Sequence, residues 1–173
     1  YSDCSKNSKV KNKIFERSFL LTNKFYMYNN LKNKYYIPTT YPIIDGKWLE
    51  RVPSEEGIFF VKNAIQDANR DNILLNNVTD IENLSSKNKK IVYVVQPALK
   101  NLLLYNKKKF DIRIMGTIVS RNHFDYDFLI FKKGYMRTTL PDFDENSLDQ
   151  EIQMTNFCVQ KKKGITILDE FIF

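Results

Sequence analysis

The chain has 173 residues, of which 43% are hydrophobic and 14% aromatic, and it carries a formal net charge of +7. This length suits one ordinary domain or two small lobes that share a cleft, and so large an apolar fraction excludes a disordered chain. The single histidine, His123, and the wide separation of Cys4 and Cys158 exclude a Cys/His zinc site.

The charge balance points to acidic partners. There are 27 Lys and Arg against 20 Asp and Glu, a surplus that favours nucleotide phosphates, nucleic acid, anionic lipid or acidic protein tails. A solvated basic surface explains the surplus equally well. No stretch approaches the roughly 18 consecutive apolar residues of a membrane span, and the N-terminus lacks a signal-peptide core. We therefore expect a cytoplasmic protein with no membrane partner.

The first part of the chain predicts helices and then a strand. Apolar residues recur at mixed spacings over residues 10–36 and indicate one or two helices, the second capped by Thr22. Two prolines within residues 37–43 favour extended geometry, which suits an edge strand or a crossing segment. The Asp-Gly pair at 45–46 indicates a turn.

A buried strand is predicted next. Residues 57–62 form a continuous apolar run that ends in Lys62, as in a strand covered on both faces. A lysine at that position either extends to solvent or holds an anion. Both interpretations remain open on the residues alone.

Three further elements follow in the middle of the chain. Residues 73–75 are a second short apolar run, and residues 76–90 predict a short helix capped by Thr79. Residues 91–96 form a β-branched run that Pro97 stops.

The second half predicts more strands. Residues 110–119 alternate charged and apolar side chains, which places Asp111 and Arg113 on one face. Residues 126–131 and 135–139 flank Lys-Lys-Gly, which predicts a hairpin with Gly134 in its turn. The end of the chain, 169–173, is typical of a helix start. Together with Arg137 of the predicted hairpin, Asp111 and Arg113 form either a structural salt bridge or a binding site.

Several segments, in order, resemble motifs of the tubulin-tyrosine ligase family of ATP-grasp enzymes and its polyglutamylase and polyglycylase relatives. Residues 109–113 (KFDIR) resemble the family signature, residues 135–139 its strand with a central arginine, and residues 154–160 its LTN segment. Upstream, residues 58–62, 92–96 and 37–42 resemble its lysine-bearing strand, its interlobe hinge and its entry segment. The agreement extends over residues 37–161.

The resemblance implies an α/β fold of ATP-grasp type, with a nucleotide cleft between two sheet-containing lobes. Residues 1–173 would be a partial domain, with 1–95 as the N-terminal and central lobe and 96–173 as the start of the C-terminal lobe. In such enzymes an acyl phosphate formed from ATP on a carboxylate is attacked by an amine. The expected reaction is addition of a free amino acid to a carboxylate of tubulin or another acidic tail, which implies association with cytoplasmic microtubules.

The resemblance also implies roles for individual residues. Lys62 would neutralise phosphate oxygens, and the stretch from Gln96 to Leu99 would present backbone groups to adenine. Arg113 and Arg137 would both offer planar forks to a carboxylate. The expected catalytic residues are Arg113 and Arg137. The expected nucleotide-binding residues are Lys62, Arg70, Gln96, Leu99, Lys109, Asp111, Thr155 and Asn156.

Two departures from the family pattern matter. The loop at 63–72 contains no glycine, which weakens backbone wrapping of phosphates, and Arg70 would substitute with its side chain. The family's Mg²⁺ ligands are expected beyond the chain end, so ATP and water alone would hold the ion. We therefore expect this chain to be inactive by itself.

The alternatives are a catalytically dead module that binds acidic tails and a nucleic-acid-binding protein. The charge and the interleaved aromatic residues support the latter. No recognised nucleic-acid signature accompanies them, so the sequence favours an acidic protein partner.

Overall fold

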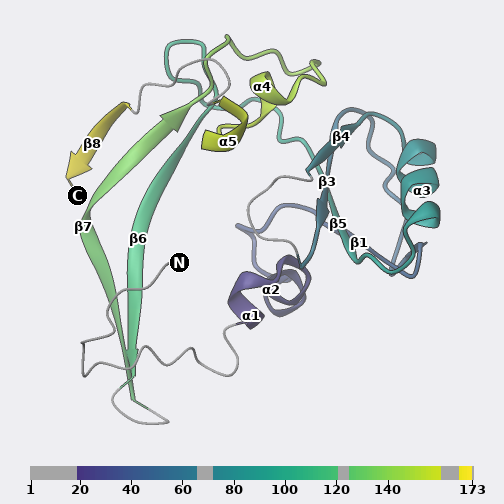
Figure 1. The fold of residues 1–173 in the computed structure, drawn as a ribbon, viewed down its shortest axis with the longest axis horizontal. Helices are drawn as coiled ribbons and strands as arrows, with labels where there is room; N and C mark the ends of the chain where they lie inside the picture. Colours follow the sequence, from purple (N-terminus) through teal and green to yellow (C-terminus); the bar gives the residue numbers. More distant parts are fainter. Residues whose placement is uncertain (1–18, 66–71, 121–124, 161–167, 173) are drawn as a thin grey trace.

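The computed structural model describes residues 19–65, 72–120, 125–160 and 168–172, which form two sheets and short helices (Figure 1). The strands are β1 (Tyr41–Ile44), β2 (Lys47–Trp48), β3 (Phe59–Asn63), β4 (Ile73–Leu75), β5 (Tyr93–Pro97), β6 (Phe110–Ser120), β7 (Tyr126–Thr138) and β8 (Leu168–Ile172). The helices are α1 (Phe19–Thr22), α2 (Lys24–Leu31), α3 (Val78–Lys87), α4 (Gln150–Gln153) and α5 (Phe157–Gln160). The sheets have the orders β2-β1-β5-β3-β4 and β6-β7-β8. This mixed, sheet-dominated architecture is consistent with the expected α/β class.

The core of the first sheet lies on the face that α3 covers. Alternate residues of β3 and β5, namely Phe59, Val61, Tyr93 and Val95, are buried there with Ile81 of α3. Burying one such side chain contributes about 1.5–3 kcal/mol. Figure 1 shows α3 on one side of this sheet and α4, α5 and the second sheet on the other. The opposite face of the sheet therefore turns toward the rest of the molecule.

A smaller cluster anchors the segment around α4 and α5 to this opposite face. Met154 packs with Ile58 and Leu74. The amide of Gln160, buried in the same segment, donates from Nε2 to Met154 O at 2.7 Å and accepts from Leu140 N at 2.9 Å. These contacts fix α5 against the residues that follow β7.

The two segments predicted to be helical contain α1, α2 and α3, whereas α4 and α5 were not predicted. Both predicted caps are wrong. Asn23, not Thr22, caps α2 and accepts from the backbone N–H two residues later at 2.9 Å. Asn77, not Thr79, caps α3 and accepts from the N–H three residues later at 2.7 Å. Thr22 ends α1, and Thr79 lies inside the first turn of α3. No helix among the described residues is long and apolar enough to cross a membrane.

The proline-containing segment becomes β1, which does not lie at the edge of the sheet. The two-residue β2 lies outside it, and Leu49 N donates to Pro42 O at 2.9 Å. The predicted turn is confirmed, because Asp45 and Gly46 join β1 to β2 with φ of 54° and 74°. Proline is tolerated here because only its carbonyl is needed.

The hairpin predicted around Lys-Lys-Gly is wrong. β7 runs without interruption through these residues and pairs with β6. Ile114 pairs with Gly134 whereas Gly116 pairs with Ile130, so the stretch is a bulge in which β7 contributes extra residues. The long β6–β7 ladder outweighs the local turn preference.

The end of the described chain is also a strand rather than the predicted helix start. β8 pairs antiparallel with β7, with Tyr135 opposite Glu170 and Gly134 opposite Phe171. The pairing partner lies far back in the sequence, so local patterns do not reveal it.

The two sheets divide the chain between Pro97 and Phe110. The expected division after residue 95 falls within β5, because Pro97 still pairs with Phe59 of β3. The segment between these sheets leads directly into Lys109.

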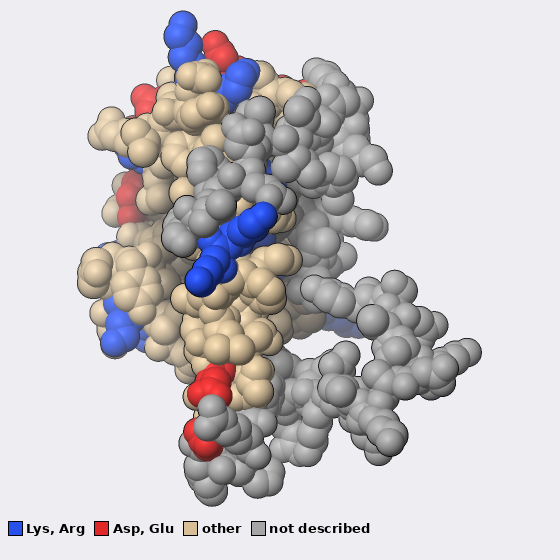
Figure 2. All heavy atoms as spheres, turned by 90° about the vertical axis from the view of Figure 1, so that its left-hand side faces the viewer, with Lys and Arg blue, Asp and Glu red and all other residues tan. Residues whose placement is uncertain are grey.

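The β6–β7 ribbon exposes apolar side chains along much of its length, including Ile112, Ile118, Phe128 and Ile130. Figure 2 views the molecule from the side of the second sheet and shows, among the described residues, mostly uncharged side chains with a group of basic side chains near the middle.

Candidate functional site

Two lysines from distant parts of the chain meet at one aromatic ring. Strand alternation places Phe60 and Lys62 on the face of β3 opposite the α3 core. Lys62 Nζ lies 5.6 Å from the centroid of the Phe60 ring, and Lys109 Nζ lies 5.0 Å from the same centroid. Lys109 also lies 5.6 Å from the Phe143 ring. One ammonium comes from the first sheet and one from the residue preceding the second.

The surroundings disfavour positive charge on both lysines. Burial, and then the charges of Lys24 and Lys109, lower the pKa of Lys62 from 10.5 to about 8. Burial also lowers the pKa of Lys109. Lys24 of α2 donates to Asn63 O at 3.1 Å, at the end of the strand that carries Lys62.

Among the described residues, no carboxylate forms an ion pair with Lys62 or Lys109. Two half-buried cations without a carboxylate partner attract an anion, because a bound anion offsets both the repulsion and the desolvation. Lys62 and Lys109 are therefore candidates for holding an anion.

A chain of hydrogen bonds crosses the sheet from Lys62. Lys62 Nζ donates to Gln96 Oε1 at 2.7 Å, and Gln96 Nε2 donates to Thr40 Oγ1 at 2.8 Å. The Thr40 hydroxyl donates in turn to Pro38 O at 2.8 Å. Gln96 was predicted as a site residue, whereas Thr40 was not. The one sequence signal for Thr40 is its place in the segment at 37–42.

The expected adenine segment lies at the end of β5. Ala98 N donates to Ile58 O at 2.7 Å, so this N–H is already used within the sheet. Leu99 follows it with an exposed side chain. The Ala98 N–H is therefore not available to a base.

The predicted charged group on the second sheet is assembled, but its two arginines differ. Asp111 lies opposite Arg137 in the β6–β7 register, and Arg137 Nε donates to Asp111 Oδ1 at 2.8 Å while Nη2 donates to Oδ2. This pairing raises the pKa of Arg137. Arg113 Nε lies 3.7 Å from Asp111 Oδ2. The Arg137 side chain is 17% exposed and that of Arg113 is 48% exposed, so Arg113 has the accessible guanidinium.

The other predicted residues are placed less directly. Thr155 and Asn156 are half-buried and directly follow Met154, which packs on the face that carries Phe60. Asn156 O accepts from Val159 N and Gln160 N at 3.0 Å, but no hydrogen bond joins either side chain to Lys62 or Lys109. Arg70 lies outside the described residues.

In the part of the chain that the structure describes, no group of three or more His, Cys, Asp or Glu residues is arranged to hold a metal ion.

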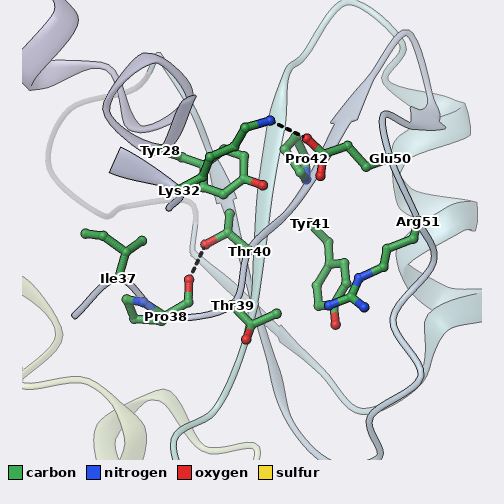
Figure 3. A pocket seen from close by; sticks show the side chains of 10 residues that line it. All are labelled: Tyr28, Lys32, Ile37, Pro38, Thr39, Thr40, Tyr41, Pro42, Glu50 and Arg51. Carbon is green, nitrogen blue, oxygen red and sulfur yellow. Dashed lines mark hydrogen bonds and ion pairs between the residues drawn. The ribbon is translucent and has the colours of Figure 1, made fainter. Parts of the chain in front are cut away.

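A pocket of about 240 Å³ lies beside Thr40, where α2 approaches β1 (Figure 3). Figure 3 shows Lys32 reaching Glu50, with which it forms an ion pair at 2.8 Å, and Arg51 lying beside Tyr41. The sequence patterns did not predict this pocket. Thr40 both lines the pocket and contacts Gln96, so it connects the pocket to Lys62 through Gln96.

Comparison with known proteins gives two findings. A model of the tubulin-tyrosine ligase family matches residues 2–169. The protein polyglycylase TTLL10 of Macaca fascicularis is 35% identical over 75 residues, which are 43% of this chain and 12% of that protein. The match thus spans a small part of the relative's length.

Proposed function

Since the chain belongs to the tubulin-tyrosine ligase family, a family of tubulin-modifying ligases, we propose that it binds ATP and serves the addition of a free amino acid to a carboxylate of tubulin or another acidic tail. This role would place it in the cytoplasm, at microtubules. The similarity to a polyglycylase makes glycine the first amino acid to test.

The observation that carries the proposal is the meeting of Lys62 and Lys109 at Phe60. Two ammonium groups with lowered pKa values and no carboxylate partner among the described residues suit the oxygens of a polyphosphate. Because each comes from a different side of the junction between the sheets, a nucleotide held there would lie between two lobes, as in an ATP-grasp enzyme.

The remaining nucleotide contacts follow from this placement. Because the Ala98 N–H is used within the sheet, the backbone at Leu99 is the part of the expected hinge proposed to contact adenine. Thr155 and Asn156, beside Met154, would supply neutral groups to the phosphates. ATP would supply the phosphoryl group that activates the acceptor carboxylate.

The two arginines take different roles in this proposal. Arg113 holds the carboxylate of the acceptor or of the amino acid, because its guanidinium is accessible and can form two parallel hydrogen bonds. Arg137 is paired with Asp111 and holds the Asp111 carboxylate in position. Asp111 in turn lies close enough to Arg113 to orient it.

Magnesium fits the described residues poorly. Mg²⁺ requires hard oxygen ligands in near-octahedral geometry, and no cluster that supplies them is found in the described ranges.

The direct test is calorimetric titration with a non-hydrolysable ATP analogue. Lys62→Ala and Lys109→Ala are each expected to weaken binding about tenfold or more, as loss of a charge-assisted contact does. Lys87→Ala, at the exposed end of α3, is the matched control and should bind as the wild type does.

A parallel titration with a glutamate-rich peptide separates the ligase from a binding module. Peptide binding without any analogue binding would identify a module for acidic tails and refute the nucleotide site. Binding of neither would refute the proposed function altogether.

A further inference from the structure

Thr40 holds a position that the proposed nucleotide contacts do not explain. It precedes β1, where the β1–β5 register pairs Tyr41 with Val95, so that Thr40 and Gln96 are the next opposing residues. Its side chain is buried, with 7% of the residue exposed. A buried hydroxyl costs stability unless it is hydrogen-bonded. Both hydrogen bonds of the Thr40 hydroxyl belong to the chain of bonds that leads from Pro38 through Gln96 to Lys62.

The direction of these bonds is fixed by the hydroxyl proton. Thr40 has one proton to donate, and it goes to Pro38 O at 2.8 Å. Toward Gln96 the Thr40 oxygen can then only accept, so the Gln96 NH₂ group must face it, at 2.8 Å. The Gln96 carbonyl oxygen consequently faces Lys62 Nζ at 2.7 Å.

The reversed amide would be unfavourable at both ends. Gln96 Oε1 would face an oxygen with no proton left, and the NH₂ group would face an ammonium. Thr40 and Lys62 therefore select the same amide orientation from opposite sides. If Thr40 loses its hydroxyl, the Gln96 NH₂ group loses its partner and the carbonyl is no longer held against the ammonium.

We propose that Thr40 is a positioning residue of this site: its hydroxyl fixes Gln96, and Gln96 holds the Lys62 ammonium where, on the proposed function, nucleotide phosphates bind. The other described charges facing Lys62 are Lys24 from α2 and Lys109 from the approach to β6, and both repel it. Gln96 Oε1 is thus the neutral acceptor that favours the charged form of Lys62.

The first arm of the test needs no nucleotide. The pH dependence of Lys62 acetylation by a trace of acetic anhydride, followed by mass spectrometry, gives its titration midpoint in the folded protein. The wild-type midpoint is expected near the pKa of about 8. Thr40→Val, which replaces the hydroxyl with a methyl group, is expected to lower it by about 0.5 or more. Thr40→Ser keeps the hydroxyl and should restore the wild-type value.

The second arm measures binding of the non-hydrolysable ATP analogue between pH 7 and 9.5. Thr40→Val is expected to bind several-fold more weakly, about fivefold at pH 7, and to lose affinity at a lower pH than the wild type. A merely structural role would reduce affinity by the same factor at every pH. The neighbouring Thr39, whose side chain is exposed, provides the control Thr39→Val, which should match the wild type.

The outcomes separate this proposal from the proposed function. An unchanged Lys62 midpoint in Thr40→Val overturns the positioning role whether or not nucleotide binds. A shifted midpoint in a protein whose wild type does not bind the analogue upholds the positioning of Lys62 and sinks the nucleotide site. If Thr40→Val does not fold by circular dichroism, Thr40→Ala and Gln96→Leu carry the same test, because each breaks the same chain of bonds.

Discussion

The lowered pKa of Lys62 predicts that the charged form of this side chain destabilises the folded protein. A lysine whose folded pKa is about 8, against its ordinary value of 10.5, lies in surroundings that disfavour its charged form. Each unit of pKa corresponds to about 1.36 kcal/mol, so the charged side chain lowers the free energy of unfolding by about 3 kcal/mol at neutral pH. Lys62→Met, which keeps length and removes charge, should therefore stabilise the protein by about 1–3 kcal/mol at pH 7.

The direction in which stability changes with pH follows from the number of protons that the folded and unfolded states bind. Between pH 8 and 10.5 the unfolded chain keeps a proton on Lys62 that the folded chain has lost, so the contribution of Lys62 to wild-type stability rises with pH in this window. Lys62→Met lacks this contribution, and its advantage over the wild type should shrink from pH 7 to pH 9.5. Titration of the other groups is common to both proteins and cancels in the difference.

Urea unfolding followed by Trp48 fluorescence measures this difference. Trp48 is a suitable probe because its indole Nε1 donates to Glu82 of α3 at 2.8 Å, a contact that unfolding breaks. Lys87→Met is the control and should show no pH-dependent difference from the wild type. A Lys62→Met protein less stable than the wild type at pH 7, or an advantage that stays constant up to pH 9.5, would refute the electrostatic reasoning.

Three further outcomes are expected. Arg113→Lys should impair use of the acceptor carboxylate about tenfold or more while analogue binding is kept, because an ammonium cannot form two parallel hydrogen bonds; kinetics against acceptor concentration, beside calorimetry, check this in a catalytically competent form of the protein, and a loss of analogue binding instead would contradict it. Asp111→Asn should lower the free energy of unfolding by about 1 kcal/mol, since it weakens a partly solvent-screened pair with Arg137, whereas Asp142→Asn, in a more exposed pair with Lys108, should change little; equal effects in urea unfolding would disprove this ranking. Asn77→Ala should cost about 1 kcal/mol by removing the cap of α3, and Thr79→Ala less than about 0.5; thermal unfolding decides, and the reverse order would restore Thr79 as the cap.

Sequence patterns located most strands of the first sheet because their signals are local. The apolar run that ends in Lys62 is strand β3, buried on the face toward α3 and half-buried on the other, and the β-branched run before Pro97 is the central β5. The Asp-Gly turn depends on two residues that tolerate positive φ, and it forms where expected. Such features depend on neighbours in the sequence.

The incorrect predictions concern segments in which contacts with residues distant in the sequence outweigh local preferences. Lys-Lys-Gly is a sound turn signal, but the pairing of β7 with β6, and of Gly134 with Phe171 of β8, keeps the chain extended. Threonines were preferred as caps where a nearby asparagine can reach the same N–H groups.

The candidate site shows the same division. Lys62, Lys109 and Asp111 could be proposed as site residues from the family motifs, but the different pairing and exposure of Arg113 and Arg137 depend on the strand register. Thr40 was missed because its partner Gln96 is 56 positions away. No local pattern shows that a threonine faces a glutamine across two strands.

The exposed β6–β7 ribbon has a consequence for the colloidal behaviour of the chain. Within the described residues, β8 pairs with β7 from Lys133 to Met136, and apolar side chains such as Phe128 and Ile130 are exposed farther along the ribbon. Exposed apolar patches promote association between molecules. The opposing force is mutual repulsion from a net charge of +7, whose range shrinks to about 8 Å at physiological ionic strength. Added salt should therefore lower the solubility of this chain, against the usual salting-in of a charged protein, and light scattering should rise with ionic strength before any unfolding is detected.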